Sequence, residues 1–160
     1  MKKFNFSHLM ALAVVALSFF VFACKQPNQA EVCSIYNTWA GPYAGEVYTI
    51  TSSTFVSEGG YEGTIEAVVE IDESSGTIFI KYTKAYEALS TEPYYQYSTT
   101  APDVGKYYAI SYKNLAKDSI SISGAYKAGG VTSTETLEEA KSTFTIENGY
   151  FADYSECTKK

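Results

Sequence analysis

The chain has 160 residues, a formal net charge of −6 at pH 7 and no arginine, because its twelve Lys and Arg positions are all lysine. An acidic chain without arginine repels phosphate backbones and cannot hold them bidentately, so we expect no nucleic-acid partner. The single histidine, His8, lies close to the N-terminus. We therefore expect no Ser-His-Asp site, no Cys-His site and no imidazole metal ligand in the folded domain.

Residues 1–23 have the composition of an export signal. Lys2 and Lys3 give a positive start, residues 9–22 form an apolar run without a charge, and Ala23 is a small residue of the kind that precedes a peptidase cut. The apolar run, about fourteen residues long, is short for a bilayer span. These features predict a cleaved signal peptide over residues 1–23, with a permanent transmembrane helix as the alternative.

Cys24 directly follows this signal. The stretch from Phe20 to Cys24 resembles the lipobox of bacterial lipoproteins, in the relaxed form found in spirochaetes. The resemblance implies that Cys24 carries acyl chains such as palmitate and that the protein lies at the bacterial outer membrane or cell surface, with the periplasmic face also open. More than one acyl chain gives stable attachment to a membrane. Residues 24–32 then form a short lipidated tether.

Residues 33–160 are long enough for one folded domain. Beyond the signal the chain keeps ten lysines and eighteen carboxylates, a net charge of about −8. Cys33 and Cys157 lie near the two ends of this domain, in an export compartment where thiols oxidise, and we expect them to form a disulfide. A catalytic thiol is the alternative, although no histidine is at hand to activate it.

Alternation of apolar and polar residues predicts strands along most of the domain. The expected strands span residues 46–50, 54–57, 64–72, 77–83, 108–112, 120–126 and 150–157. Residues 72–76 and 114–118 have turn composition, so the strands that flank them should pair as hairpins. One strand carries four apolar residues that we expect on a single buried face: Ile65, Ala67, Val69 and Ile71.

Residues 136–141 break the alternation. Thr136 and Glu139 have the spacing of a capping box and are followed by good helix formers, which predicts one short helix near the C-terminus. Short strands that pair antiparallel with their neighbours in the chain, together with one helix near the C-terminus, predict an all-β fold. We expect a small up-and-down or meander barrel of about eight strands. A flattened sandwich is the alternative.

Trp39 is the only tryptophan and precedes the run of strands. From Cys24 onward the chain resembles the small lipocalin-like lipoproteins of spirochaetes, in which an early tryptophan precedes antiparallel strands behind an acylated cysteine. The resemblance implies a lipocalin-like barrel. It also implies that the barrel binds a small apolar or amphipathic ligand.

Tyrosine dominates the candidate binding residues, and all fifteen tyrosines lie beyond Cys24. Tyrosines on strands could line an interior cavity or simply fill a packed core. Residues 84–104 show no clear periodicity and are rich in tyrosine, so we predict a functional loop there, with a disordered crossover as the alternative. The candidate ligand-binding residues are Tyr82, Tyr94, Tyr95, Tyr97, Tyr108, Tyr112 and Tyr126.

We do not expect an enzyme, a cofactor or a metal site. Glu66 and Glu70 are four residues apart on one expected strand, roughly 13 Å, which is too far for the paired carboxylates of a glycosidase. The function expected from the sequence is therefore non-enzymatic ligand binding. The alternative is a surface module with a filled barrel, such as an adhesin or hydrolase inhibitor, whose partner is a host or envelope protein.

Overall fold

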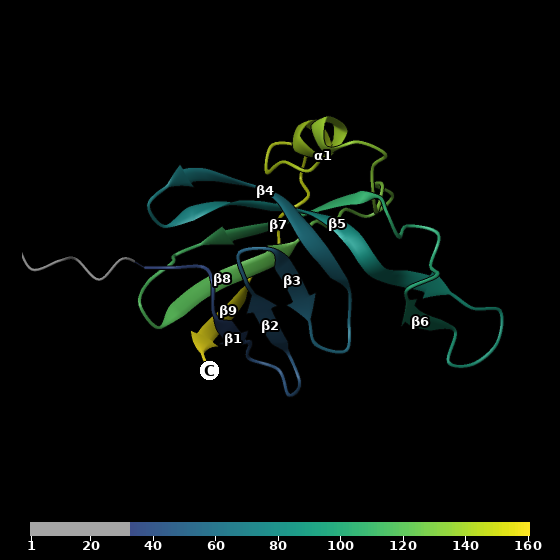
Figure 1. Cartoon of the computed structure of the whole chain (residues 1–160), viewed down its shortest axis with the longest axis horizontal. Helices are drawn as coiled ribbons and strands as arrows, with labels where there is room; N and C mark the ends of the chain where they lie inside the picture. The colour runs from purple at the N-terminus through teal and green to yellow at the C-terminus, as the bar shows by residue number, and fades with distance from the viewer. Residues whose placement is uncertain (1–32) are drawn as a thin grey trace, which may run out of the picture. The chain divides into compact units, whose positions relative to one another are not determined.

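The computed structural model describes residues 33–160, which form a closed antiparallel barrel of eight strands with one short helix (Figure 1). The expected signal peptide, Cys24 and the tether at residues 24–32 lie outside the described residues. The strands are β1 (Thr38–Ala40), β2 (Val47–Ile50), β3 (Thr54–Ser57), β4 (Glu62–Asp72), β5 (Ser75–Ala88), β6 (Tyr95–Ser98), β7 (Tyr107–Lys113), β8 (Ser119–Gly124) and β9 (Ser155–Lys159), and the helix is α1 (Leu137–Thr143). The all-β barrel expected from the sequence is confirmed.

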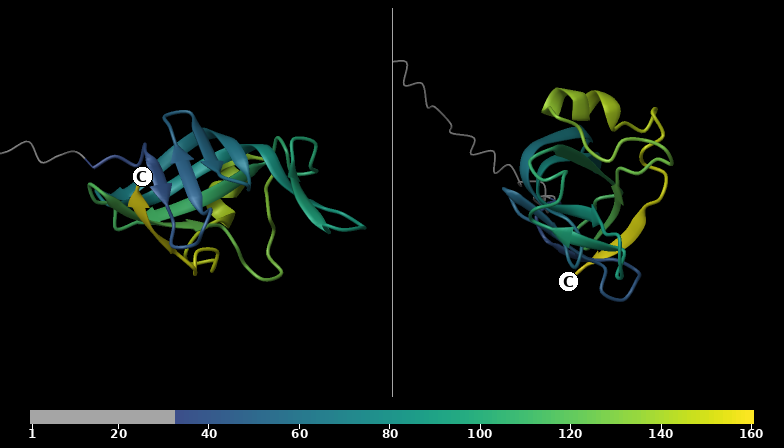
Figure 2. Two further views of the ribbon diagram at one scale, coloured as in Figure 1. Left: turned by 90° about the horizontal axis from the view of Figure 1, so that it is seen from below. Right: turned by 90° about the vertical axis from the view of Figure 1, so that its right-hand side faces the viewer.

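The strands meet in the order β4-β3-β2-β1-β9-β8-β7-β5, and pairing between β4 and β5 closes the ring. Closure leaves no free edge in the barrel wall. The end-on view shows the ring with α1 outside it (Figure 2, right). The additional strand β6 pairs only with the end of β5, from Ala85↔Ser98 to Ala88↔Tyr95, so the β5–β6 hairpin projects from one end of the barrel (Figure 1).

The interior of the barrel is filled with side chains at its centre. Inward residues of β5 and β7 alternate along each strand, and the pair Ile78↔Ile110 lies at their contact with both side chains fully buried. Trp39 is also fully buried, and its indole N–H donates to the carbonyl of Ile35 at 2.9 Å. With Phe55 these side chains form an interior core without solvent access. Burial of such large apolar side chains stabilises the fold by about 1.5–3 kcal/mol each.

The register of β4 differs from the sequence expectation. A bulge between Ile65 and Ala67 shifts the pairing, so that Ile65 lies opposite the inward Ile80 while Ala67 lies opposite the outward Phe79. An extra residue in one strand of a pair reverses which side chains face inward beyond it. Ile65, Ala67, Val69 and Ile71 therefore do not share one buried face, and Val69 and Ile71 lie exposed on the outer wall.

The structure also differs from the sequence expectation at one loop and at the bounds of two strands. The long loop predicted at residues 84–104 is wrong, because β5 continues to Ala88 and β6 returns along it. The last strand is β9, which begins at Ser155 rather than at residue 150. Strand β8 ends at Gly124, so Tyr126 lies beyond it. Strand β1 has only three residues, too few to show an alternation, and was not predicted.

The helix α1 is capped as the sequence predicts. Thr136 Oγ1 accepts from the Glu139 amide at 3.2 Å, and the Glu139 carboxylate accepts from the Thr136 amide at 3.0 Å. Ala140 is fully buried, and Phe144 at the C-cap makes edge contacts with Tyr108 and Tyr150 at 5.8 and 5.1 Å between ring centroids. The helix therefore packs on the barrel through one turn. Among residues 33–160 no helix has the length and apolar character needed to cross a bilayer.

Gly63 in β4 marks a close approach between neighbouring strands. A Cβ at this position would lie 2.7 Å from the carbonyl oxygen of Lys81 and 2.8 Å from Cδ1 of Ile80.

We predict that Gly63→Ala lowers the free energy of unfolding by about 1–3 kcal/mol, because the backbone of β5 must shift to make room. Denaturant unfolding measures this change. The control Thr83→Ala removes an exposed side chain from β5 and should change it by less than about 0.5 kcal/mol, and equal effects of the two variants would contradict the close packing.

Candidate ligand-binding site

One end of the barrel opens into a cavity of about 230 Å³, which we call the mouth. Six tyrosines line it: Tyr61, Tyr82, Tyr86, Tyr97, Tyr108 and Tyr126. Ala85, Asp103, Ala125 and Thr132 complete the lining. The lining comes from β5, β6 and the start of β7, and from the segments before β4, before β7 and between β8 and α1. The mouth therefore lies at the end of the barrel from which the β5–β6 hairpin projects.

The floor of the mouth is a packed group of three tyrosines. Tyr82 near the end of the barrel part of β5 and Tyr108 at the start of β7 stack at 5.1 Å between centroids, with 24° between their planes. Tyr61, just before β4, meets both rings edge-on at 5.9 and 5.2 Å. Stacked and edge-on pairs are the arrangements that aromatic rings prefer, so the three rings hold one another in place.

Gly124 provides the space for this group. A Cβ at this position would lie 2.7 Å from the hydroxyl oxygen of Tyr108 and 3.1 Å from that of Tyr61. The two hydroxyls therefore converge on the end of β8, where only glycine leaves room for them. Gly124 therefore marks a close approach of side chains to the backbone.

The hydroxyls of the floor stay protonated at physiological pH. Burial raises the pKa of Tyr82, and the nearby Tyr108 and Asp103 raise it further. Burial is also the main cause that raises the pKa values of Tyr61 and Tyr108 well above 10. The floor therefore presents neutral O–H groups, each able to donate and accept a hydrogen bond.

The rim of the mouth is more exposed than the floor. Tyr126 is 72% exposed and Tyr86 is 53% exposed, whereas Tyr82 and Tyr108 are each 8% exposed. Tyr86 meets Tyr97 of β6 edge-on at 6.2 Å, so the projecting hairpin supplies one side of the rim. Tyr86 and Tyr126 are therefore the lining tyrosines most accessible to a ligand from solvent.

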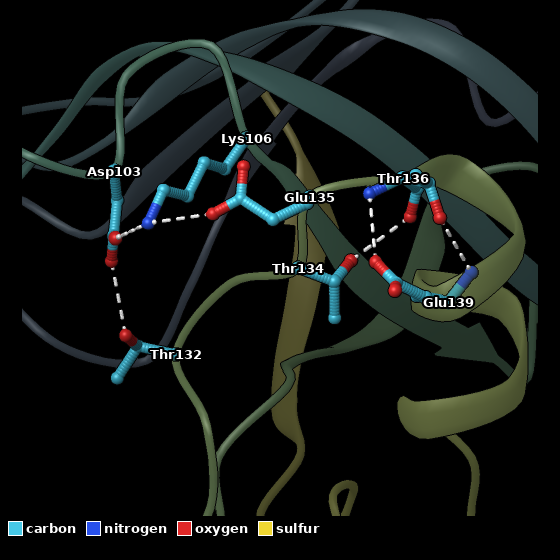
Figure 3. Close-up of polar contacts among 7 residues, drawn as sticks. All are labelled: Asp103, Lys106, Thr132, Thr134, Glu135, Thr136 and Glu139. Atoms are coloured by element: carbon cyan, nitrogen blue, oxygen red, sulfur yellow. Dashed lines mark hydrogen bonds and ion pairs between the residues drawn. The ribbon is translucent and has the colours of Figure 1, made fainter.

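A polar clasp includes two lining residues of the mouth, Asp103 and Thr132 (Figure 3). Thr132 Oγ1 donates to Asp103 Oδ2 at 3.0 Å, and Lys106 Nζ lies 3.6 Å from Asp103 Oδ1 and 3.1 Å from Glu135 Oε1. Tyr107 and Thr134 pair through two backbone hydrogen bonds of 2.9 and 3.0 Å. The clasp joins the segment before β7 to the segment before α1 and holds Asp103 at the cavity wall.

The structure brings together four of the seven candidate tyrosines: Tyr82, Tyr97, Tyr108 and Tyr126. Tyr112 pairs with Gly76 at the opposite end of β7, with its hydroxyl over that glycine, and is outside the mouth. Tyr94 and Tyr95 lie exposed on the hairpin and do not line the cavity.

Six lining residues were not among the candidate ligand-binding residues: Tyr61, Ala85, Tyr86, Asp103, Ala125 and Thr132. Tyr86 and Asp103 lie within the tyrosine-rich segment at residues 84–104, so the segment was a usable signal even though its expected structure was wrong. Nothing in the local pattern marks Thr132, which the Asp103 hydrogen bond brings to the wall.

A second cavity, of about 270 Å³, lies outside the barrel wall beneath α1. Its lining is mainly apolar and includes Val69, Phe79, Phe144, Ile146 and Phe151. Val69, which the β4 bulge turns outward, lines this groove and stays 45% exposed. The polar lining residues of the groove are Thr77, Lys141, Thr145 and Glu147, whereas six tyrosines line the mouth, and we regard the mouth as the better candidate for specific recognition.

The disulfide expected between Cys33 and Cys157 is not formed in the structure. Cys157 lies opposite Ile120 on the inner face of β9, is buried, and its thiol donates to the carbonyl of Ser155 at 3.3 Å. Cys33 is partly exposed on the segment before β1. Burial, with the carboxylates of Glu46 and Glu156 nearby, raises the pKa of Cys157 to about 12. The Cys157 thiol is therefore a core side chain.

Comparisons with known proteins assign neither a family nor a function. No family model matches the chain, and no curated protein or solved structure matches it. Within residues 33–160 no three Cys, His, Asp or Glu side chains gather into a group that could hold a metal ion. The function must therefore be argued from the mouth.

We predict that Cys157 resists alkylation in the native protein at neutral pH, because its thiol is buried and its pKa of about 12 leaves almost no thiolate. Mass spectrometry after iodoacetamide treatment without reductant measures this. Unfolding before treatment should make both Cys33 and Cys157 react. Two cysteines that stay unreactive after unfolding and react only once reduced would show that the disulfide forms after all.

Proposed function

We propose that this protein is a lipid-anchored, non-enzymatic binding protein that takes a small amphipathic molecule into the mouth. The observation that carries the proposal is the tyrosine-lined cavity above a filled interior core. Tyrosine combines a large apolar ring with a hydroxyl at low cost in conformational entropy. Such a lining suits a molecule with both apolar and polar parts.

The size of the mouth limits the ligand. Its volume of about 230 Å³ is below the usual 300–1,000 Å³ of pockets for drug-sized molecules. Since the interior core beyond the floor is filled, a long acyl chain has no channel to enter. The ligand we propose is therefore one ring or a short branched molecule.

Anchoring through Cys24 is the second part of the proposal. Residues 33–37 lead into β1, where Trp39 pairs with Lys159 at the end of β9, and β9 begins at Ser155, opposite Ile122 near the mouth end of β8. The chain thus enters the barrel at the end away from the mouth.

The anchor has a direct test. We predict that Cys24→Ser moves the protein from the membrane fraction to the soluble fraction and abolishes incorporation of labelled palmitate, because the acyl chains supply the membrane affinity. Cys33→Ser is the matched control and should leave both unchanged. Membrane retention of the Cys24→Ser protein would contradict anchoring by acylation.

Ligand binding has its own test. We predict that a panel of small neutral, cationic and anionic amphipathic molecules contains binders that shift the NMR amide signals of Ala85, Tyr108 and Ala125 in the purified full chain. Tyr126→Ala should weaken such binding about tenfold, because it removes a rim ring that contacts the ligand.

The control for this variant is Tyr43→Ala. Tyr43 is 74% exposed, close to the 72% of Tyr126, but it does not line the mouth. It should leave the affinity unchanged. Binding that is equally weakened by both variants, or a panel with no binder at the mouth, would contradict the proposal.

The second candidate function is protein binding by the β5–β6 hairpin. Tyr94 and Tyr95 are 61% and 54% exposed there, and Tyr95 stacks on Tyr86 at 5.8 Å. Exposed, rigid aromatic side chains are typical of protein interfaces. A photo-crosslinking residue at position 94 that gives a single adduct in the native envelope, lost in Tyr95→Ser, would favour this function over the mouth.

A further inference from the structure

The charged lining of the mouth is negative only. Its lining includes one carboxylate, Asp103, and no lysine. The rest of the lining is six tyrosine rings, two alanines and one threonine. Tyrosine faces carry partial negative charge, so both the rings and the carboxylate favour a positive group in the cavity.

The clasp does not neutralise Asp103. Lys106 is shared between two carboxylates and lies nearer to Glu135, at 3.1 Å, than to Asp103, at 3.6 Å. The three side chains together carry one excess negative charge. The negative charge of Asp103 acts electrostatically at the floor of the mouth, where it is among the causes that raise the pKa of Tyr82.

The chain already places ammonium groups on tyrosine faces elsewhere. Lys113 Nζ lies 3.8 Å from the ring centroid of Tyr154. Two further pairs, Lys81 on Tyr107 and Lys127 on Tyr150, have distances of 5.5 and 5.8 Å. All three are within the roughly 6 Å over which a cation is attracted to an aromatic face. None of these three rings lines the mouth, so within residues 33–160 these lysines do not occupy its tyrosine faces.

We infer that the ligand of the mouth is an organic ammonium ion, such as a quaternary or alkylated amine, whose head sits among the tyrosine rings with Asp103 as its counter-charge. This inference rests on the proposed function and names its ligand class. The exposed rim rings of Tyr86 and Tyr126 offer aromatic surface to the head, and Asp103 supplies charge complementarity from the clasp. A phosphate next to the ammonium group would be repelled by Asp103, so the ligand is an ammonium ion without a neighbouring phosphate.

Three probes with heads of the same shape separate the contributions of the positive charge, the apolar surface and a phosphate. Choline carries a trimethylammonium head, 3,3-dimethylbutan-1-ol is its neutral carbon isostere, and phosphocholine adds a phosphate to the same head. NMR titration of the purified full chain, followed at Ala85 and Ala125, gives the three dissociation constants. We expect choline to bind at least about tenfold more tightly than either of the other probes.

Two variants test the named groups. Asp103→Asn keeps an acceptor for Thr132 but removes the charge, and should lower the preference for choline over its isostere about tenfold. The charge-matched control is Glu138→Gln on α1, which removes a charge from a side chain that is 82% exposed and outside the mouth. This control should leave the preference unchanged.

The contribution of the aromatic rings is tested at Tyr126 of the rim, because substitution of this exposed side chain should leave the fold intact. Tyr126→Leu replaces an aromatic face by an apolar side chain and should weaken choline binding while leaving the isostere unaffected, whereas Tyr126→Phe should preserve choline binding. An equal loss for choline and its isostere would overturn the role of the aromatic face.

The outcomes separate this inference from the proposed function. A preference for choline that depends on Asp103 and Tyr126 supports the inference. Equal or tighter binding of the isostere, or binding at the mouth only by neutral or anionic members of the amphipathic panel, overturns the inference and leaves the proposed function standing. A mouth that binds no probe and no member of that panel overturns both.

Discussion

The pairing of β5 with three different strands is the constraint on which the rest of the structure depends. Its first part pairs with β4 on one side and β7 on the other, which closes the barrel, and its last part leaves the barrel and pairs with β6. One continuous strand of fourteen residues therefore connects the filled interior, the floor of the mouth and the projecting hairpin. Ile78, Tyr82 and Tyr86 follow one another at intervals of four along the strand and belong to these three levels in turn.

This arrangement separates stability from recognition. The interior core around Trp39 and Ile110 is fully buried, so the fold needs no ligand to fill its centre. The mouth lies where the strands end and where tyrosines replace isoleucines as the inward side chains. Its lining residues are held by ring packing and by the Asp103–Thr132 clasp. The binding groups we propose are therefore positioned before a ligand arrives, which lowers the entropic cost of binding.

Much of the barrel could be predicted from the sequence because its strands alternate locally. Residues 54–57 form a strand as expected, and the capping box at Thr136 and Glu139 forms as expected. The mouth could be predicted only in part, because the register between β5 and β7 brings Tyr82 and Tyr108 together and no local pattern reports it. The β4 bulge was missed for a related reason, since Ile65, Ala67, Val69 and Ile71 alternate correctly by themselves and only their pairing with β5 shows the reversal.

The central claim is that the barrel has a filled core below an open, tyrosine-lined mouth that binds the ligand. A crystal structure of the full chain grown with choline at saturating concentration tests it most directly. The claim predicts density for the ligand in the mouth, with its head within about 6 Å of the ring centroids of Tyr82 or Tyr126, and an unchanged core around Ile78. Ligand density inside an opened core, or in the groove beneath α1 with the mouth empty, would contradict it.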